Sequence, residues 1–260
     1  NGYESSMKHE NAQSQMTRVP SLKGFTLIEL LVVIAVIGIL ASLIVGVSGV
    51  ATTKARLSQT SALLNNVSTA IDSYHADIGS FPPDALLRNG VVNTVTNQLF
   101  YELTGTVYTE RRTYASLSGS DEIGRPQINR FFGRDGFQNV ARNQAEVKGY
   151  LDLKASEVGE ISENPSIRVV KAPIPWPLKQ IEGNYQDVLG RNRSMESLRP
   201  YQGRNQRFRG MNTWQYRSSG LNRFNQQSFD LWADLVIGNK IYRVNNWSTQ
   251  PKVFEALTQP

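Results

Sequence analysis

The sequence predicts an α+β protein in which one long N-terminal helix packs on an antiparallel β-sheet near the C-terminus. Three observations support this fold class. Residues 25–50 form an almost uninterrupted apolar run, residues 51–76 continue it without Pro or Gly, and the last third of the chain contains short stretches in which apolar and polar residues alternate. The mixed composition of residues 84–178 predicts a loop-rich region between the helix and the sheet.

The first half of the helix, residues 25–50, carries Glu29 as its only charge. A helix of this length spans about 39 Å, which exceeds the roughly 30 Å hydrocarbon core of a bilayer. We therefore expect residues 25–50 to form the transmembrane half of the helix. The alternative is a secretory signal peptide cut near Ala51, although the apolar region of such a peptide is usually only about 7–15 residues long.

The second half of the helix, residues 51–76, is expected to be amphipathic. Gly79, Pro82 and Pro83 then end the helix, and the remainder, residues 77–260, is expected to be an extracytoplasmic globular domain. His75, near the helix end, is expected to face solvent. The apolar stripe has spacings of three, four and seven and consists of Leu57, Leu64, Val67, Ile71 and Tyr74.

Composition excludes several kinds of chemistry. The chain has no cysteine, which rules out thiolate nucleophiles, disulfides and Cys-based zinc sites. His9 and His75 are the only histidines, and no paired-carboxylate motif is present, so we expect no enzymatic activity. The formal charge of +6 permits acidic partners without requiring them.

Glu29 stands out in the apolar run, because a carboxylate at the centre of a membrane helix costs about 2.5–3.5 kcal/mol and needs a partner. Cleavage after Gly24 would create one, since the new amine of Phe25 would lie at about the same depth. The other interpretation places Glu29 among lipid head groups with no partner. The charge pattern alone leaves both interpretations open.

The stretch K-G-F-T-L-I-E at residues 23–29, followed directly by the apolar run, resembles the N-terminal signature of type IV prepilins and type II secretion pseudopilins. The resemblance implies a leader peptide, residues 1–24, which a prepilin peptidase removes by cutting between Gly24 and Phe25. It also implies that the same enzyme methylates the amine of Phe25. During assembly, Glu29 would pair with the N-terminal amine of a neighbouring subunit.

Three strands are expected in the C-terminal third, at residues 214–218, 228–233 and 240–244. The stretches F-D-L-W at 229–232 and N-W at 246–247 resemble the closing sheet of the major type II pseudopilin, and 187–190 resembles its preceding turn more weakly. The resemblance therefore implies a type IV pilin fold. Because residues 84–178 are more than the compact subunits of that branch carry, it also implies that part of this region is a loop-rich insertion. Among such filaments it favours a secretion pseudopilus over a pilus.

Major type II pseudopilins often hold calcium in the loop after the F-D-L strand, and in this chain Asp234 stands in that loop. Tyr242 and Arg243 occupy the places of the later aspartates. Calcium needs several hard oxygen ligands, and one carboxylate beside an arginine is a poor site. We therefore expect no metal, no cofactor and an ordinary loop position for Asp234.

The middle of the chain is expected to hold a short helix at 97–103 and short strands at 128–132 and 167–170. Loops are expected at 114–127 and 133–143, and the proline-rich stretch 172–177 predicts an extended connector.

The tract 197–229 combines arginines and interleaved aromatic residues with no acidic residue. This mixture suits nucleic acid or acidic polysaccharide, and it also suits a solvated sheet face. Because no recognised nucleic-acid module is present, we expect the sheet face and no nucleic-acid partner. The arginines are Arg199, Arg204, Arg207, Arg209, Arg217 and Arg223.

These expectations combine into a structural subunit of a type II secretion pseudopilus or type IV pilus-like filament. It would begin as a single-pass inner-membrane protein with its N-terminus in the cytoplasm and end in a periplasmic or extracellular filament. Expected partners are a prepilin peptidase/N-methyltransferase, identical and related pilin-like subunits, and inner-membrane assembly machinery. The alternatives are a pilus subunit for adhesion, motility or DNA uptake, and a membrane-tethered binding protein that never polymerises.

Overall fold

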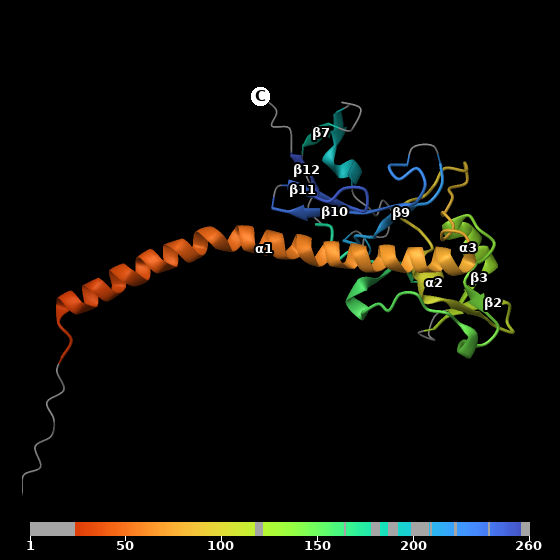
Figure 1. Ribbon diagram of the computed structural model, residues 1–260, viewed down its shortest axis with the longest axis horizontal. Coiled ribbons are helices and arrows are strands. Elements are labelled where there is room, and N and C mark those ends of the chain that lie inside the picture. The colour runs from red at the N-terminus through yellow and green to blue at the C-terminus, as the bar shows by residue number, and fades with distance from the viewer. Residues whose placement is uncertain are drawn as a thin grey trace, which may run out of the picture. The chain divides into compact units, whose positions relative to one another are not determined.

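A computed structural model of the chain (Figure 1) describes residues 24–117, 122–163, 165–177, 183–186, 192–198, 208, 210–220, 223–238 and 240–255, with side chains for all of these except 43–48, 196 and 255. The expected leader, residues 1–24, lies outside the described residues except for Gly24, as does the weakly matched turn at 187–190. The chain divides into two compact units, residues 1–49 and residues 50–260.

The long helix α1 runs from Leu27 to Ile78, which confirms the expected helix to within two residues at each end. Gly79 ends it with a left-handed backbone, φ +82°, and the Gly79 N–H donates to the His75 carbonyl oxygen at 2.9 Å. In the part of the chain that the structure describes, no helix combines the length and the apolar content that crossing a membrane requires.

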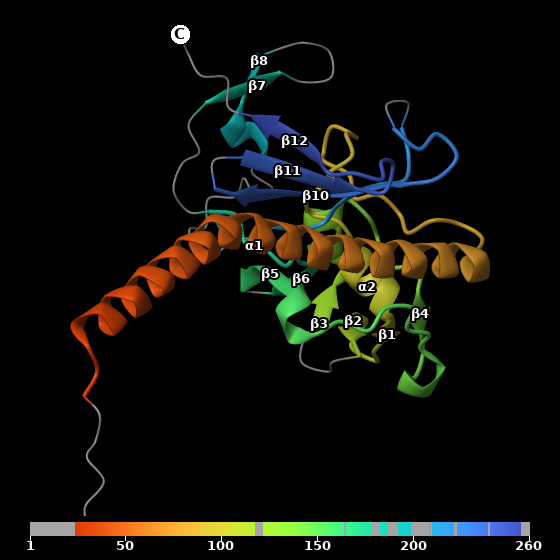
Figure 2. The ribbon, with the colours of Figure 1, turned by 60° about the vertical axis from the view of Figure 1, so that its left-hand side comes forward.

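In the second unit, the amphipathic stripe of α1 is buried as predicted. Leu64, Val67, Ile71 and Tyr74 have almost no exposed surface, and Leu57 packs against the same core from a half-buried position. Figure 2 shows β10 and β11 running alongside this half of α1. Apolar side chains from the C-terminal sheet join the same core, namely Phe229, Leu231, Ala233, Leu235 and Val244.

The C-terminal sheet is antiparallel with the order β12-β11-β10-β9. Its strands are β9 (Gln215–Arg217), β10 (Asp230–Ile237), β11 (Lys240–Asn245) and β12 (Lys252–Glu255). The three expected strands are confirmed, although β10 begins two residues late and continues past Ala233. The last strand, β12, was not expected. Alternate residues of β10 face the helix, so Trp232, Asp234 and Val236 lie on the outer face of the sheet.

A second layer covers part of that outer face. It is built from β7 (Asn184–Gln186), β8 (Asn192–Ser194) and the 3-10 helix η3 (Met195–Leu198). The stretch 172–177 leads into this layer without helix or strand, as the prolines predict, and buries Trp176. The apolar contact with the sheet is made by Trp176, Met195, Leu198, Ile241 and Phe254.

The region between α1 and the C-terminal sheet holds more regular structure than the sequence predicts. A four-stranded sheet has the order β3-β2-β1-β4, and a hairpin pairs β5 with β6. The expected helix at 97–103 and strand at 167–170 are confirmed as α2 and β6. The elements are α2 (Leu99–Thr104), β1 (Thr106–Tyr108), β2 (Thr113–Ser116), β3 (Glu122–Gly124), α3 (Arg125–Phe132), β4 (Val140–Ala141), η1 (Gln144–Glu146), η2 (Ala155–Glu157), β5 (Val158–Glu163) and β6 (Ser166–Val170).

Two predictions for this region are wrong. Residues 128–132 belong to the helix α3 and not to a strand. Pro126 stands in its first turn, Gly133 ends it with φ +63°, and Ile128 and Phe132, four residues apart, are both fully buried on one face. The expected loop at 114–127 contains most of β2, all of β3 and the start of α3, while 133–143 is irregular apart from β4.

Candidate functional site at the helix N-terminus

The N-terminus of α1 is organised by Thr26 and Glu29. Thr26 precedes the first helical residue, and both its backbone N–H and its Oγ1 hydroxyl donate to Glu29 Oε2 at 2.8 Å. The Glu29 N–H donates to Thr26 Oγ1 at 3.3 Å, and the Leu30 N–H donates to the Thr26 carbonyl oxygen at 3.2 Å. This is a capping box, in which two otherwise unpaired backbone donors of the helix start are satisfied reciprocally.

The capping box leaves Gly24 and Phe25 outside the helix. The peptide bond between them lies in exposed, non-helical chain, and the Phe25 side chain is 82 % exposed. A Cβ placed on Gly24 would meet no atom within 4 Å. The bond that the prepilin resemblance marks for cleavage therefore joins two exposed, non-helical residues.

The structure brings Glu29 close to its own Thr26, a contact that our sequence reasoning missed. The signal was present, since Thr and Glu three residues apart before an apolar run predict a capping box. The described hydrogen bonds of the Glu29 carboxylate all use Oε2, and no described donor bonds to Oε1. One carboxylate can thus cap its own helix and still offer an oxygen to a second partner.

The surface of α1 beyond the cap is apolar all round. Each described large apolar side chain between Phe25 and Leu40 is exposed by 47 % or more. A helix that is apolar on every face needs a cover of lipid or protein. Gly38 on this surface is exposed, and a methyl group added to it would meet no atom within 4 Å.

Asp234 is not a loop residue, which corrects our expectation. It lies in β10 opposite Arg243 of β11, with the Arg243 Nε and Nη2 groups each donating to one carboxylate oxygen at 2.7 Å. The Asp234 side chain is almost fully buried, so the ion pair is shielded from water. Both oxygens are therefore already used by arginine. Within the described ranges, no three His, Asp or Glu side chains come close enough to hold a metal.

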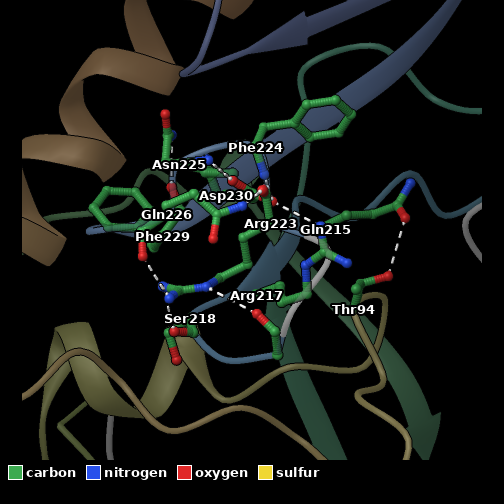
Figure 3. A network of polar contacts seen from close by, with 12 residues as sticks. Thr94, Gln215, Arg217, Ser218, Arg223, Phe224, Asn225, Gln226, Phe229 and Asp230 are labelled. Atoms are coloured by element: carbon green, nitrogen blue, oxygen red, sulfur yellow. Dashed lines mark hydrogen bonds and ion pairs between the residues drawn. The ribbon is translucent and has the colours of Figure 1, made fainter. Parts of the chain in front are cut away.

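The described part of the arginine tract serves the fold. Arg217 forms an ion pair with the fully buried Asp230 at 2.7 Å, and Arg223 donates to main-chain carbonyl oxygens including those of Ser218 and Gln226 (Figure 3). Both arginines therefore stabilise the fold, but the expected solvated sheet face is wrong for them, since Arg217 is half-buried on β9 and Arg223 lies between β9 and β10. The other four arginines of the tract, Arg199, Arg204, Arg207 and Arg209, lie outside the described residues. His75 is exposed, as expected, and stacks on Phe81 with ring centroids 4.1 Å apart.

One buried carboxylate had no sequence signal. Glu102, in the first turn of α2, is fully buried and accepts hydrogen bonds from the Tyr74 hydroxyl and the Asn139 N–H, both at 2.9 Å, and from the Gln138 N–H. Burial raises the pKa of the Glu102 carboxyl, while these three donors oppose the rise. The carboxylate ties α1 to the loop before β4, so we assign it to the fold.

Comparison with known proteins bears on the N-terminal site. No solved structure matches the chain. Residues 22–45 match the family model of the prokaryotic N-terminal methylation motif, and this segment contains Gly24, Phe25, the capping box and the first part of the exposed apolar helix. The motif implies processing by a prepilin peptidase and assembly with pilin-like subunits. The chain thus carries the N-terminal methylation motif that is the signature of the type IV prepilin and pseudopilin family.

Proposed function

We propose that the chain is a structural, non-enzymatic subunit of a type II secretion pseudopilus or a related type IV pilus-like filament. The start of helix α1 is the main support for this proposal. An exposed Gly24–Phe25 bond, a capped helix and the carboxylate of Glu29 lie in one segment that matches the methylation motif. Function then depends on covalent processing at Phe25 and on burial of the apolar helix.

Processing has two steps. Hydrolysis of the peptide bond after Gly24 releases the leader with a new carboxylate and frees the amine of Phe25. The peptidase then transfers a methyl group from a methyl donor to that amine, which keeps its positive charge. The exposed, non-helical geometry around Gly24 suits the first step, because a protease needs extended and accessible chain.

The apolar first half of α1 would be covered in succession by two environments. We propose that residues 25–50 first lie in the inner membrane, as a single span with the N-terminus in the cytoplasm. The assembly machinery then moves the subunit into a periplasmic or extracellular filament, where neighbouring helices replace lipid. Glu29 Oε1 would accept the methylated amine of Phe25 from an adjacent subunit while Oε2 keeps the helix cap.

The choice of a secretion pseudopilus rests on the closing sheet. The Asn246 side chain accepts from the Leu231 N–H at 2.9 Å and donates to the Phe229 carbonyl oxygen at 3.0 Å. The two stretches that resemble the major pseudopilin, F-D-L-W and N-W, are thus joined by hydrogen bonds at the end of the sheet. This is the arrangement that supports the secretion branch over a pilus for adhesion, motility or DNA uptake.

The proposal is tested by expressing the chain with and without a prepilin peptidase and measuring the mass of the membrane-extracted product. We expect loss of all residues up to Gly24 and the mass of one methyl group on Phe25. Gly24→Val should block both changes, whereas Gly38→Val should not, and both glycines have open space for a side chain. An intact leader in the presence of the peptidase, or a cut near Ala51, would overturn the proposal.

A further inference from the structure

A pocket with aromatic walls lies on the outer face of the C-terminal sheet, in the second unit. Its volume is about 390 Å³, within the range of small-ligand sites. We call it the aromatic pocket. It lies beside the part of the sheet that β7, β8 and η3 cover, and it is lined by Tyr185, Phe224, Arg243, Asn245, Trp247, Ser248, Gln250, Lys252 and Phe254.

Phe224 provides a stacking surface in this pocket. Its ring lies parallel to that of Trp247, with an interplanar angle of 9° and centroids 4.4 Å apart, and the side chain is still 50 % exposed. One ring face therefore packs on Trp247, and half of the side-chain surface stays open to a ligand. An aromatic ring that lines a pocket offers a large apolar contact area.

Buried contacts fix the position of Phe224. The Phe224 N–H and the Asn225 N–H each donate to one oxygen of Asp230 at 2.9 Å, and Arg217 holds the same carboxylate from the other side. Figure 3 shows the Phe224 ring directed away from this polar network. The fully buried carboxylate of Asp230 holds the backbone of Phe224, and the ring is held by its stack on Trp247. Such a ring loses little conformational entropy when a ligand stacks on it, so the surface is pre-organised.

Charge narrows the class of ligand. The lining contains two cations, Arg243 and Lys252, and no Asp or Glu among the described residues. The Arg243 charge is balanced by its ion pair with Asp234 behind it, whereas Lys252, opposite Arg243 on β12, is exposed and adds a net positive charge at the rim. A ligand with one negative charge fits this balance better than a neutral or cationic one.

The polar groups of the lining narrow the class of ligand further. Asn245, Ser248 and Gln250 also line the pocket. The Asn245 amide is bonded to the main chain of Arg243 and Trp247, and the Ser248 hydroxyl donates to the Gln250 carbonyl oxygen. The Ser248 oxygen can still accept a hydrogen bond, and the Gln250 side-chain amide can donate and accept. A sugar ring has an apolar C–H face that packs on an aromatic ring and hydroxyl groups that need such donors and acceptors. Single-stranded nucleic acid would also stack, but its phosphates call for several cations, and Lys252 alone in the described lining adds an unbalanced positive charge.

We propose that the aromatic pocket binds an acidic saccharide, with a uronate ring stacked on Phe224 and its carboxylate beside Lys252. This adds a binding site to the subunit and does not depend on filament assembly. Along a filament the site would repeat on each subunit, so that weak binding to a polyuronate would be multiplied by avidity.

The test uses the full chain in a detergent without a sugar head group and an alginate trisaccharide as the probe, measured by isothermal titration calorimetry at low salt. Mannotriose serves as the neutral probe of equal length. We expect saturable binding of the uronate that weakens with added salt. Phe224→Ala should weaken it about tenfold, as expected for loss of one stacked ring.

Matched variants separate this site from general effects. Tyr108→Ala removes another half-exposed aromatic side chain, on β1, and should leave binding unchanged. Phe224→Tyr keeps the ring and should bind as the wild type does, with an unchanged near-ultraviolet circular dichroism spectrum. Lys252→Gln, at an exposed position, should abolish the preference for uronate over mannotriose, a change of about threefold.

Four outcomes would overturn the proposal. They are absence of saturable uronate binding, equal effects of Phe224→Ala and Tyr108→Ala, equal affinity for mannotriose and the uronate, and tighter binding of an oligothymidylate than of the uronate at this pocket.

Discussion

Replacement of Glu29 by glutamine separates two functions of one side chain. In the structure, Glu29 Oε2 accepts two hydrogen bonds from Thr26 at 2.8 Å. No described donor bonds to Glu29 Oε1, so this oxygen can accept from a second partner. A glutamine amide oxygen can accept the same two bonds, because capping boxes use Glu or Gln. Glu29→Gln therefore preserves the helix start and removes only the negative charge.

The size of the effect follows from what the charge is proposed to do. If the Phe25 amine of a neighbouring subunit pairs with Glu29 in an apolar filament core, removing the carboxylate leaves a buried cation unpaired. That costs about 3–5 kcal/mol, or roughly two to four orders of magnitude in the association constant of each subunit. Loss of the cap alone, as in Thr26→Val, costs about 0.5–2 kcal/mol.

The assay is the yield of sheared filaments from cells that carry the assembly machinery, normalised to the total amount of processed subunit. We expect almost no filament from Glu29→Gln and a milder loss from Thr26→Val. Processing at Gly24 should continue in both variants, as the mass of the subunit would show. The reasoning fails if Glu29→Gln assembles normally while Thr26→Val does not, because Glu29 would then act only as a helix cap.

Three further predictions concern the second unit and are measured by urea denaturation of the detergent-solubilised chain. Tyr74→Phe removes the hydroxyl that donates to the buried Glu102, so it should lower the free energy of unfolding by about 1.5–3 kcal/mol. An unchanged free energy of unfolding would mean that this hydrogen bond contributes nothing to stability. Because burial raises the pKa of Glu102 above its usual 4.5, the folded protein holds this proton more tightly than the unfolded chain, so stability should fall as the pH rises from 4.5 towards neutral. Glu102→Gln should remove that part of the slope, and an unchanged slope would contradict the assignment. Gly133→Ala should lower the free energy of unfolding by about 1–2 kcal/mol for the left-handed backbone and by about 1–3 kcal/mol more for overlap with a main-chain carbonyl oxygen. Gly90 also has a positive φ but open space around it, so Gly90→Ala should show only the first loss. Equal losses in the two variants would show that the overlap relaxes.

The parts of the fold that sequence reasoning predicted are those that local periodicity specifies. The helix over 27–78 follows from an unbroken run without proline, and its buried stripe follows from the spacing of Leu64, Val67, Ile71 and Tyr74. The strands β9, β10 and β11 follow from alternation. The wrong strand at 128–132 shows the limit of that approach, because a short apolar segment fits both periods, and Pro126 and Gly133 decided for a helix.

The sequence by itself determined the candidate site, since Gly24, Phe25 and Glu29 lie within six residues and match a motif that is read along the chain. Only the tertiary structure decided how the remaining charges are used. Asp234 pairs with Arg243, Asp230 with Arg217, and Glu102 with donors that are 28 to 37 residues away. A buried carboxylate must find donors wherever folding brings them, and strand register and loop closure select those donors from distant segments. For that reason composition predicted only a sheet face for the tract 197–229, whereas the folded chain shows Phe224 stacked on Trp247 in the lining of a pocket.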